Sequence, residues 1–306
     1  MLKANVLLGK PTSTDISIEE MLHEWEGLNA LPGVTYTVKR YETFPTPEEF
    51  NALIDEDADA ALGVWITKEF INEHFFQTHP KCKYIAGLAH GYEDMDFSIS
   101  RKYGVTITNT AYGASTIAEF AFSLLLDICH KIELHSQYVK DTKWWEPNAP
   151  KYTYALTKQI ELSGLTFGVV GLGKIGWHAA RIAQGFGMKV ISYNRHVKTG
   201  PEYDFIEQVS LDELFARADV ISLHTPLNAS TRYMINRGSI AKMKDGVILI
   251  NTARGSLVDE EALVEALQSG KIYAAGLDVI SEEPPTRPLP ILQQAIDKGV
   301  ILSEQR

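Results

Sequence analysis

The chain of 306 residues has only two cysteines, no long apolar run and no run of basic residues. Cys82 and Cys129 stand far apart without C-x-x-C or histidine spacing, which excludes a disulfide framework and a zinc site, and no other pattern predicts a metal. We expect both to be buried as small hydrophobic side chains. No apolar stretch approaches the roughly 18 residues that a membrane span requires, so we expect no membrane association.

An excess of positive charge is missing as well. The 29 lysines and arginines stand against 39 aspartates and glutamates, which gives a net charge of −10. Such a chain repels polyanions, so we expect no nucleic acid partner and favour a small molecule instead. The N-terminus has one early lysine, Lys3, and an apolar patch too short for a secretory signal, which indicates a cytoplasmic location.

What the chain does have is a regular alternation of apolar, β-branched runs with amphipathic stretches, which is typical of parallel α/β architecture. The length predicts two domains, residues 1–108 and 109–306. The first has five expected strands and helices over Ile16–Leu28 and Pro47–Ile54, which suits a flavodoxin-like domain. The second has six expected strands, from "LTFGVVG" to "GVIL", which suit a complete doubly wound parallel sheet.

Between these two sets of strands lies a stretch from Ala111 to Asp141 whose apolar residues recur at three- and four-residue spacing. It predicts one long helix. We favour core packing between domains over a dimer seam as the reason for its apolar character, although one helix can serve both. The following segment, Lys143–Pro150, with Trp144 and Trp145, reads as an exposed aromatic loop that is available to a partner subunit, so we expect a homodimer.

A glycine motif marks the start of the second domain's sheet. In "FGVVGLGKIGWHAARIAQGFG", Gly171, Gly173 and Gly176 have G-x-G-x-x-G spacing directly after a strand and before a helix. The first glycine permits the tight turn, the second lets backbone approach a pyrophosphate, and the third lets helix pack closely on strand. The pattern predicts a Rossmann dinucleotide site formed by Gly171, Leu172, Gly173, Lys174, Ile175 and Gly176.

The end of the next strand indicates which dinucleotide binds. An acidic residue about 20 positions after the motif normally holds the adenosine ribose, but Asn194 stands 18 residues after Gly176 (194 minus 176), followed by Arg195, His196 and Lys198. A neutral side chain removes repulsion against a 2′-phosphate, and a guanidinium supplies paired donors for it. NADP is therefore preferred over NAD, which remains possible if these cations are ordinary surface charges.

Five motifs in order resemble the D-isomer-specific 2-hydroxyacid dehydrogenases, and within them the glycerate dehydrogenase/hydroxypyruvate reductase group. They are "LAHGYEDMD" with "GVTITNT", "VVGLGKIG", "SLHTPLNAST", "ILINTARGSLVDEEALVEAL" and "AAGLDVISEEPP". The resemblance covers nearly the whole chain. It implies a substrate-binding domain and a nucleotide-binding domain with the active site in the cleft between them, and reversible hydride transfer between NAD(P)H and a small 2-oxo acid such as glyoxylate or hydroxypyruvate.

The resemblance also implies roles for individual residues. The loop of Leu88, Ala89, His90 and Gly91 would hold the substrate carboxylate through its backbone amides, and Arg254 of "NTARG" would grip the carboxylate and keto oxygen. Glu283 would orient a catalytic histidine and raise its pKa. The cofactor would be contacted by Thr225, Pro226, Thr252, Ala253 and Asp278.

At the C-terminus the sequence departs from the pattern of the family that it resembles. In the family a histidine follows the last strand in a stretch of the form T-P-H, and aligning "GVIL" with that strand puts Ser303, Glu304 and Gln305 in its place. We expect the catalytic histidine, and the return helix that completes the first domain, to be missing or replaced. A cut or altered C-terminus is the preferred explanation. The alternatives are a variant that uses another acid, and an NADP-binding sensor, against which the retention of Arg254 and Glu283 argues.

Overall fold

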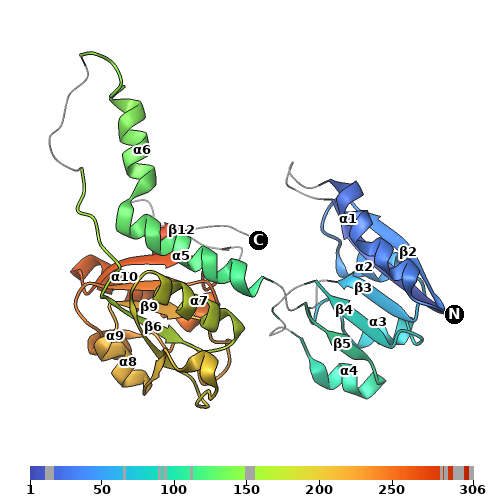
Figure 1. The fold of residues 1–306 in the computed structure, drawn as a ribbon. Coiled ribbons are helices and arrows are strands. Elements are labelled where there is room, and N and C mark those ends of the chain that lie inside the picture. Colours follow the sequence, from blue (N-terminus) through green and yellow to red (C-terminus); the bar gives the residue numbers. More distant parts are fainter. Residues whose placement is uncertain are drawn as a thin grey trace. The chain divides into compact units, whose positions relative to one another are not determined.

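The computed structural model divides the chain into two compact units, Met1–Tyr112 and Gly113–Arg306, each of which is a parallel α/β structure (Figure 1). The residues that it describes are 1–10, 17–64, 67–88, 91, 95–110, 113–148, 156–282, 285, 289–291 and 300–302. The α/β fold class predicted from the alternating pattern is confirmed.

The first unit contains a five-stranded parallel sheet in the order β2-β1-β3-β4-β5, which is the flavodoxin-like order. Its core is rich in aromatic side chains, among them the fully buried Phe75 and Phe76. The strands are β1 (Leu2–Gly9), β2 (Val34–Tyr41), β3 (Ala60–Val64), β4 (Tyr84–Gly87) and β5 (Thr106–Thr108), and the helices are α1 (Ile18–Trp25), the 3₁₀-helix η1 (Glu26–Ala30), α2 (Pro47–Leu53), α3 (Glu73–Thr78) and α4 (Phe97–Tyr103).

Two helices of this unit begin where the sequence supplies a capping box. The Ser17 hydroxyl accepts from the backbone N–H of Glu20 at 3.1 Å while the Glu20 carboxylate accepts from the Ser17 N–H at 2.9 Å. Thr46 and Glu49 repeat the arrangement before α2, with Pro47 at the first helical position. Each box satisfies two N–H groups that a helix start leaves without partners.

The second unit contains a seven-stranded parallel sheet in the order β12-β11-β10-β9-β6-β7-β8. The six strands predicted from the sequence are confirmed. The strands are β6 (Thr166–Val170), β7 (Lys189–Tyr193), β8 (Glu207–Gln208), β9 (Val220–Leu223), β10 (Val247–Asn251), β11 (Ile272–Leu277) and β12 (Val300–Leu302). The edge strand β8 was not predicted, because two polar residues carry no apolar pattern and pair with β7 through the backbone alone.

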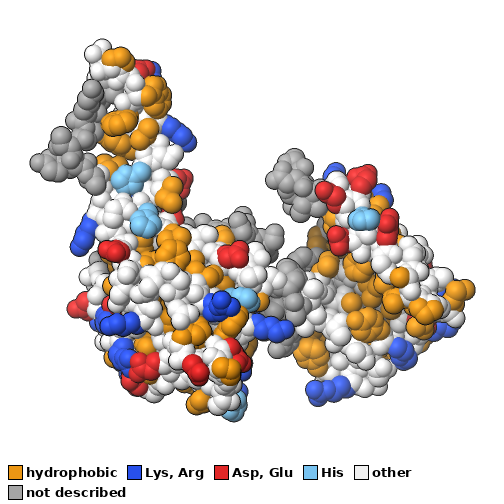
Figure 2. Space-filling model, viewed as in Figure 1, with side chains coloured by type: hydrophobic (Ala, Val, Ile, Leu, Met, Phe, Trp, Pro, Cys, Tyr) orange, Lys and Arg blue, Asp and Glu red, His pale blue; other side chains and the backbone are white. Residues whose placement is uncertain are grey.

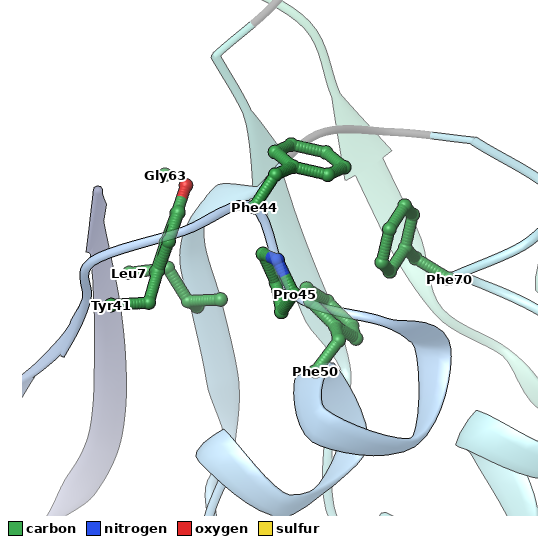
Figure 3. A pocket seen from close by; sticks show the side chains of 7 residues that line it. All are labelled: Leu7, Tyr41, Phe44, Pro45, Phe50, Gly63 and Phe70. Carbon is green, nitrogen blue, oxygen red and sulfur yellow. The ribbon is translucent and has the colours of Figure 1, made fainter. Parts of the chain in front are cut away.

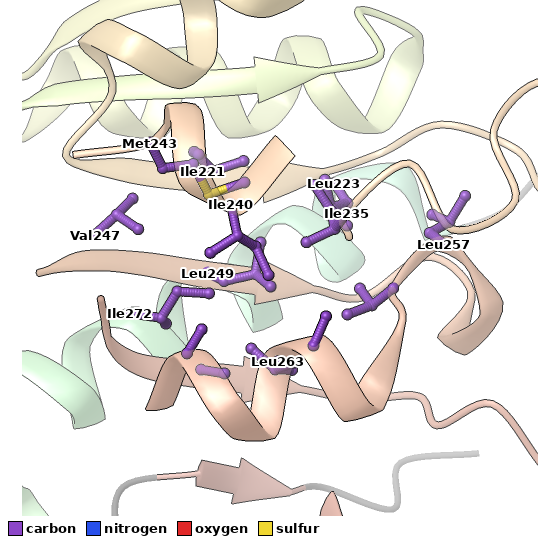
Figure 4. Packing of buried hydrophobic residues seen from close by; sticks show 14 of the residues in the cluster. Ile221, Leu223, Ile235, Ile240, Met243, Val247, Leu249, Leu257, Leu263 and Ile272 are labelled. Atoms are coloured by element: carbon purple, nitrogen blue, oxygen red, sulfur yellow. The ribbon is translucent and has the colours of Figure 1, made fainter. Parts of the chain in front are cut away.

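Helices cover both faces of this second sheet, as expected for a doubly wound structure (Figure 1). On one face, branched side chains of β9, β10 and α10 interdigitate, including Ile221, Leu249 and Leu263 (Figure 4). The helices are α5 (Ala114–His130), α6 (Ile132–Asp141), α7 (Lys174–Gly185), α8 (Leu211–Arg217), α9 (Arg237–Lys242) and α10 (Glu260–Ser269), with 3₁₀-helices η2 (Pro201–Tyr203) and η3 (Gly255–Leu257).

The single helix expected over Ala111–Asp141 is wrong, because the chain breaks it at Lys131, which adopts a left-handed conformation with φ of 50°. Asp127 stabilises the break: its carbonyl accepts from the Lys131 N–H at 2.6 Å and its carboxylate from the Ile132 N–H at 3.1 Å. The buried face of α5 packs on α7, β10 and β11 of its own unit, whereas α6 buries no residue and projects from that unit (Figure 1).

Both cysteines are buried free thiols, as predicted, and burial raises the pKa of each to about 11. In the described part of the chain, no helix is long and apolar enough to cross a membrane. Among those same residues no cluster of three or more histidine, cysteine, aspartate or glutamate side chains is arranged to hold a metal ion.

Candidate functional site

The candidate site lies at the carboxyl edge of the second sheet, where the strand order reverses around β6. The chain runs from β6 outward to β7 and β8 on one side and to β9, β10 and β11 on the other. Loops on the two sides of such a point separate and leave a crevice, which is where doubly wound sheets bind ligands. The loop from β6 to α7, with the glycine motif, begins at this point.

The three glycines of the motif are required for different reasons. Gly171 has φ of 98°, and a Cβ there would lie 2.6 Å from the carbonyl oxygen of His224. A Cβ on Gly176 would overlap the carbonyl oxygen of Gly171, so helix and loop pack directly against each other. A Cβ on Gly173 would meet no atom within 4 Å, so the backbone there faces open space.

This geometry fits a dinucleotide pyrophosphate. Helix α7 starts at Gly173 without a side-chain cap, so its first N–H groups are available to an anion. Leu172 is buried in the core and contributes only its backbone, while Lys174 is exposed beside the glycine turn and Ile175 is half-buried against the core.

Asn194, where the sequence lacks the expected carboxylate, joins the glycine loop to the turn after β7. Its side-chain oxygen accepts from the Leu172 N–H at 3.0 Å, and its side-chain nitrogen donates to the carbonyl of His196 at 2.7 Å. Arg195 and His196 are exposed beyond it, and neither forms an ion pair within the described residues. The turn therefore presents positive charge beside the glycine loop.

The end of β9 carries the "HTP" segment. His224 hydrogen-bonds through Nε2 to the Ser222 hydroxyl at 2.9 Å, and burial lowers the pKa of its imidazole to about 4. The ring is therefore neutral at pH 7. Thr225 and Pro226 follow it at the sheet edge, and the Pro226 carbonyl accepts from the Thr231 hydroxyl at 2.7 Å.

The ends of β10 and β11 bring the "NTARG" and "GLDV" motifs together. The Asp278 N–H donates to the carbonyl of Asn251 at 3.0 Å, so Asp278 lies beside the turn that carries Thr252, Ala253 and Arg254. The Thr252 hydroxyl oxygen is buried without a hydrogen-bond partner in the described part of the chain. A buried hydroxyl in this state suits a site that a polar ligand completes.

Sequence reasoning missed the residue that shapes this turn. The side-chain oxygen of Asn251 accepts from the Ala253 N–H at 3.1 Å, and its side-chain nitrogen donates to the Arg254 carbonyl at 3.0 Å. Arg254 itself donates from its guanidinium to the Ala253 carbonyl at 2.7 Å. An asparagine just after a strand is a known signal for such side-chain turns, so Asn251 could have been predicted.

A second missed feature is the contact between the loops after β10 and β11. A Cβ on Gly255 would overlap the carbonyl of Ile280, so the two loops touch through backbone alone. Glu260, at the start of α10, accepts from the Ser281 N–H at 2.6 Å and from its hydroxyl at 2.8 Å. These contacts hold the loop that carries Asp278 against the turn of residues 252–254, which we call the arginine turn.

The predicted substrate loop is described only in part. Leu88 and Gly91 belong to the first unit, where the Leu88 N–H donates to the Val64 carbonyl at 3.0 Å. The predictions on Ala89, His90, Glu283 and residues 303–305 lie outside the described residues.

Comparisons with known proteins identify the family of this chain. Residues 122–301 match the family model described as D-isomer specific 2-hydroxyacid dehydrogenase, NAD binding domain. A hydroxypyruvate reductase from Blautia hydrogenotrophica is 38% identical over 262 residues, covering 85% of this chain and 79% of the relative. A hydroxypyruvate reductase from Thermotoga maritima is 46% identical over 206 residues, covering 67% of this chain and 64% of the relative.

The fold comparison points the same way. The crystal structure of a glyoxylate reductase from Paecilomyes thermophila superposes with a TM-score of 0.76 at 30% identity, covering 99% of this chain and 88% of that one. With the glycine loop, the arginine turn and Asp278 on one sheet edge, the chain belongs to the D-isomer-specific 2-hydroxyacid dehydrogenase family, and its second unit is that family's NAD-binding domain.

Proposed function

We propose that the chain catalyses hydride transfer between NAD(P)H and a small 2-oxo acid such as glyoxylate or hydroxypyruvate. The observation that carries the proposal is the common edge of β6, β10 and β11, which gathers a dinucleotide loop, an arginine turn and Asp278. The relatives named hydroxypyruvate reductase and glyoxylate reductase support this choice of substrate.

In this proposal Arg254 binds the substrate carboxylate and polarises the keto oxygen, because a planar guanidinium offers paired donors and keeps its charge. Thr252, Ala253 and Asp278 contact the nicotinamide carboxamide, and the buried Thr252 hydroxyl gains its partner there. The loop of residues 88–91 holds the carboxylate through backbone amides. The product oxygen takes its proton from water or from an acid whose pKa Glu283 raises. The nicotinamide supplies the hydride, so the protein contributes orientation and charge stabilisation.

The test is reduction of hydroxypyruvate and glyoxylate by the purified protein, followed through the absorbance of the reduced nicotinamide. Arg254→Ala is expected to lower turnover about 10²-fold or more while changing the Kd of the cofactor little, because Arg254 acts on the substrate. Comparable losses in turnover and cofactor affinity would sink its assigned role. Cofactor binding without any turnover in the unaltered chain would favour a sensor over a reductase.

The preferred cofactor in this proposal is NADPH. Asn194 places no negative charge at the end of β7, and its side-chain oxygen is already engaged by the Leu172 N–H. Arg195 follows directly and is exposed. Fluorescence titration is expected to give tighter binding of NADPH than of NADH, and Arg195→Ala should weaken NADPH binding about tenfold while leaving NADH binding unchanged. Equal changes in the Kd of both cofactors would show that Arg195 is an ordinary surface residue with no role in cofactor selection.

The proposed assembly is a homodimer formed through the arm, by which we mean α6 and residues 142–148. Apolar side chains of the arm are exposed, among them Ile132 at 61%, Trp144 at 52% and Trp145 at 64% (Figure 2). Large apolar side chains exposed on one projecting segment indicate an interaction site. Sedimentation should give a dimer for the native chain and a monomer for Trp144→Ser with Trp145→Ser; a native monomer would refute the assembly.

A further inference from the structure

One side chain connects the two sides of the nucleotide crevice. The Arg195 guanidinium donates to the Ser230 hydroxyl at 3.1 Å. Arg195 follows β7 and Ser230 follows β9, and β6 lies between these strands in the sheet. The bridge therefore spans the carboxyl end of β6, directly beside the glycine loop.

Ser230 is itself held in one orientation. Its hydroxyl donates to the side-chain oxygen of Asn228 at 2.7 Å, and its backbone N–H donates to the same oxygen at 2.9 Å. Because the hydroxyl proton is used, the hydroxyl oxygen is left to accept from Arg195. Only one of the five guanidinium donors is engaged within the described residues, so the others remain for a ligand.

The backbone of the same turn is held from the other side. Gln208 on β8 accepts from the Lys198 N–H at 2.7 Å and donates to the Lys198 carbonyl at 2.7 Å. Lys198 lines a surface hollow that is also lined by Gly173, Lys174 and Glu202. The turn after β7 is thus fixed by Asn194, by Gln208 and, through Arg195, by Ser230.

We propose that Ser230 and Gln208 are positioning residues that set the selectivity for a dinucleotide bearing a 2′-phosphate. Ser230 holds the Arg195 side chain across the end of β6, and Gln208 holds the main chain from which the cationic side chains project. A guanidinium that is already ordered loses less conformational freedom when it binds a phosphate, so the ordering favours NADPH and leaves NADH unaffected. The inference rests on the proposed preference for NADPH.

The test measures the Kd of NADPH and NADH for the full chain and for Ser230→Ala, Gln208→Leu and Ser230→Thr. Ser269→Ala and Gln268→Leu serve as matched controls, because these residues lie on α10 and, among the described residues, the Ser269 hydroxyl bonds only within its own helix. Adenosine 2′,5′-bisphosphate and adenosine 5′-phosphate probe the adenosine end alone.

We expect Ser230→Ala and Gln208→Leu each to weaken binding of NADPH and of the bisphosphate about fivefold, with NADH and adenosine 5′-phosphate within twofold of native. Ser230→Thr, which keeps the hydroxyl, should restore selectivity. Because Ser230 acts through Arg195, adding Ser230→Ala to Arg195→Ala should cause no further loss.

Equal losses for both dinucleotides, or additive losses with Arg195→Ala, would overturn the positioning role. The native protein could prefer NADPH while the Ser230 and Gln208 variants keep the native ratio of the Kd of NADH to that of NADPH. This result would overturn the positioning role and leave the proposed preference for NADPH standing. A native protein that binds NADH as tightly as NADPH would overturn both.

Discussion

The two sheets of this chain have reversal points of the same kind, between β1 and β3 in the first and between β6 and β9 in the second. At each, a glycine with positive φ lies against the neighbouring backbone. A Cβ on Gly63 would lie 2.6 Å from the Leu7 carbonyl oxygen, and one on Gly171 would lie 2.6 Å from that of His224. The shared sterics come from the parallel topology.

Beyond that close approach the two points differ in chemistry. In the first unit, Leu7 and Gly63 line an apolar hollow together with Phe44, Phe50 and Phe70, whose rings gather around Pro45 (Figure 3). The Phe50 and Phe70 centroids are 5.0 Å apart, edge to face. The reversal point of the second unit is polar instead: it has the uncapped N–H groups at the start of α7, together with Asn194 and Arg195. The strand order produces a crevice at each reversal point, and the residues of the adjoining loops determine whether that crevice can bind an anion.

The largest expected effect is a loss of stability when the aromatic packing of the first unit is removed. Phe50 is 3% exposed, so Phe50→Ala should cost about 3–5 kcal/mol of that unit's stability while leaving the Kd of NADPH unchanged. Phe44→Ala is the matched control, because Phe44 lines the same hollow but is 60% exposed. Thermal unfolding followed by circular dichroism measures the loss. A simultaneous loss of NADPH affinity would show that the reversal points of the two sheets are not independent of each other.

The next effect concerns the glycine loop. Gly176→Ala places a Cβ on the Gly171 carbonyl, which should cost about 1–3 kcal/mol and weaken NADPH binding by up to roughly 100-fold. Gly173→Ala is the contrast: its Cβ meets nothing, so thermal stability should stay native while NADPH binding still falls, because the methyl group occupies the space of the pyrophosphate. Native affinity in Gly173→Ala would contradict the placement of the dinucleotide.

The smallest effect depends on pH. Burial lowers the pKa of His224 to about 4, below its ordinary value near 6.5, so the unfolded chain binds a proton more readily than the folded one. Stability from the neutral ring is complete above pH 6.5 and decreases as the pH falls toward 4. His224→Gln should reduce this decrease in the second unit. An unchanged pH profile would assign the decrease to carboxylates.

Local patterns predicted much of the fold because strands and helices are encoded by short-range periodicity. The alternating apolar runs located every strand of both sheets except β8, and the glycine spacing located the turn after β6. The single helix over Ala111–Asp141 is wrong because a left-handed residue at Lys131, held by Asp127, is a local exception to a continuous pattern. The roles of Ala89, His90 and Glu283 stay predictions.

The sequence by itself determined most of the strands and helices, because backbone sterics and apolar spacing act over a few residues. It also placed Gly176 and Arg254 in recognisable motifs. Only the tertiary structure decided the contacts that join distant segments: Arg195 with Ser230, Gly255 with Ile280, and Gln208 with Lys198. Such pairs leave no periodic trace in the chain, because they depend on which parallel strands become neighbours.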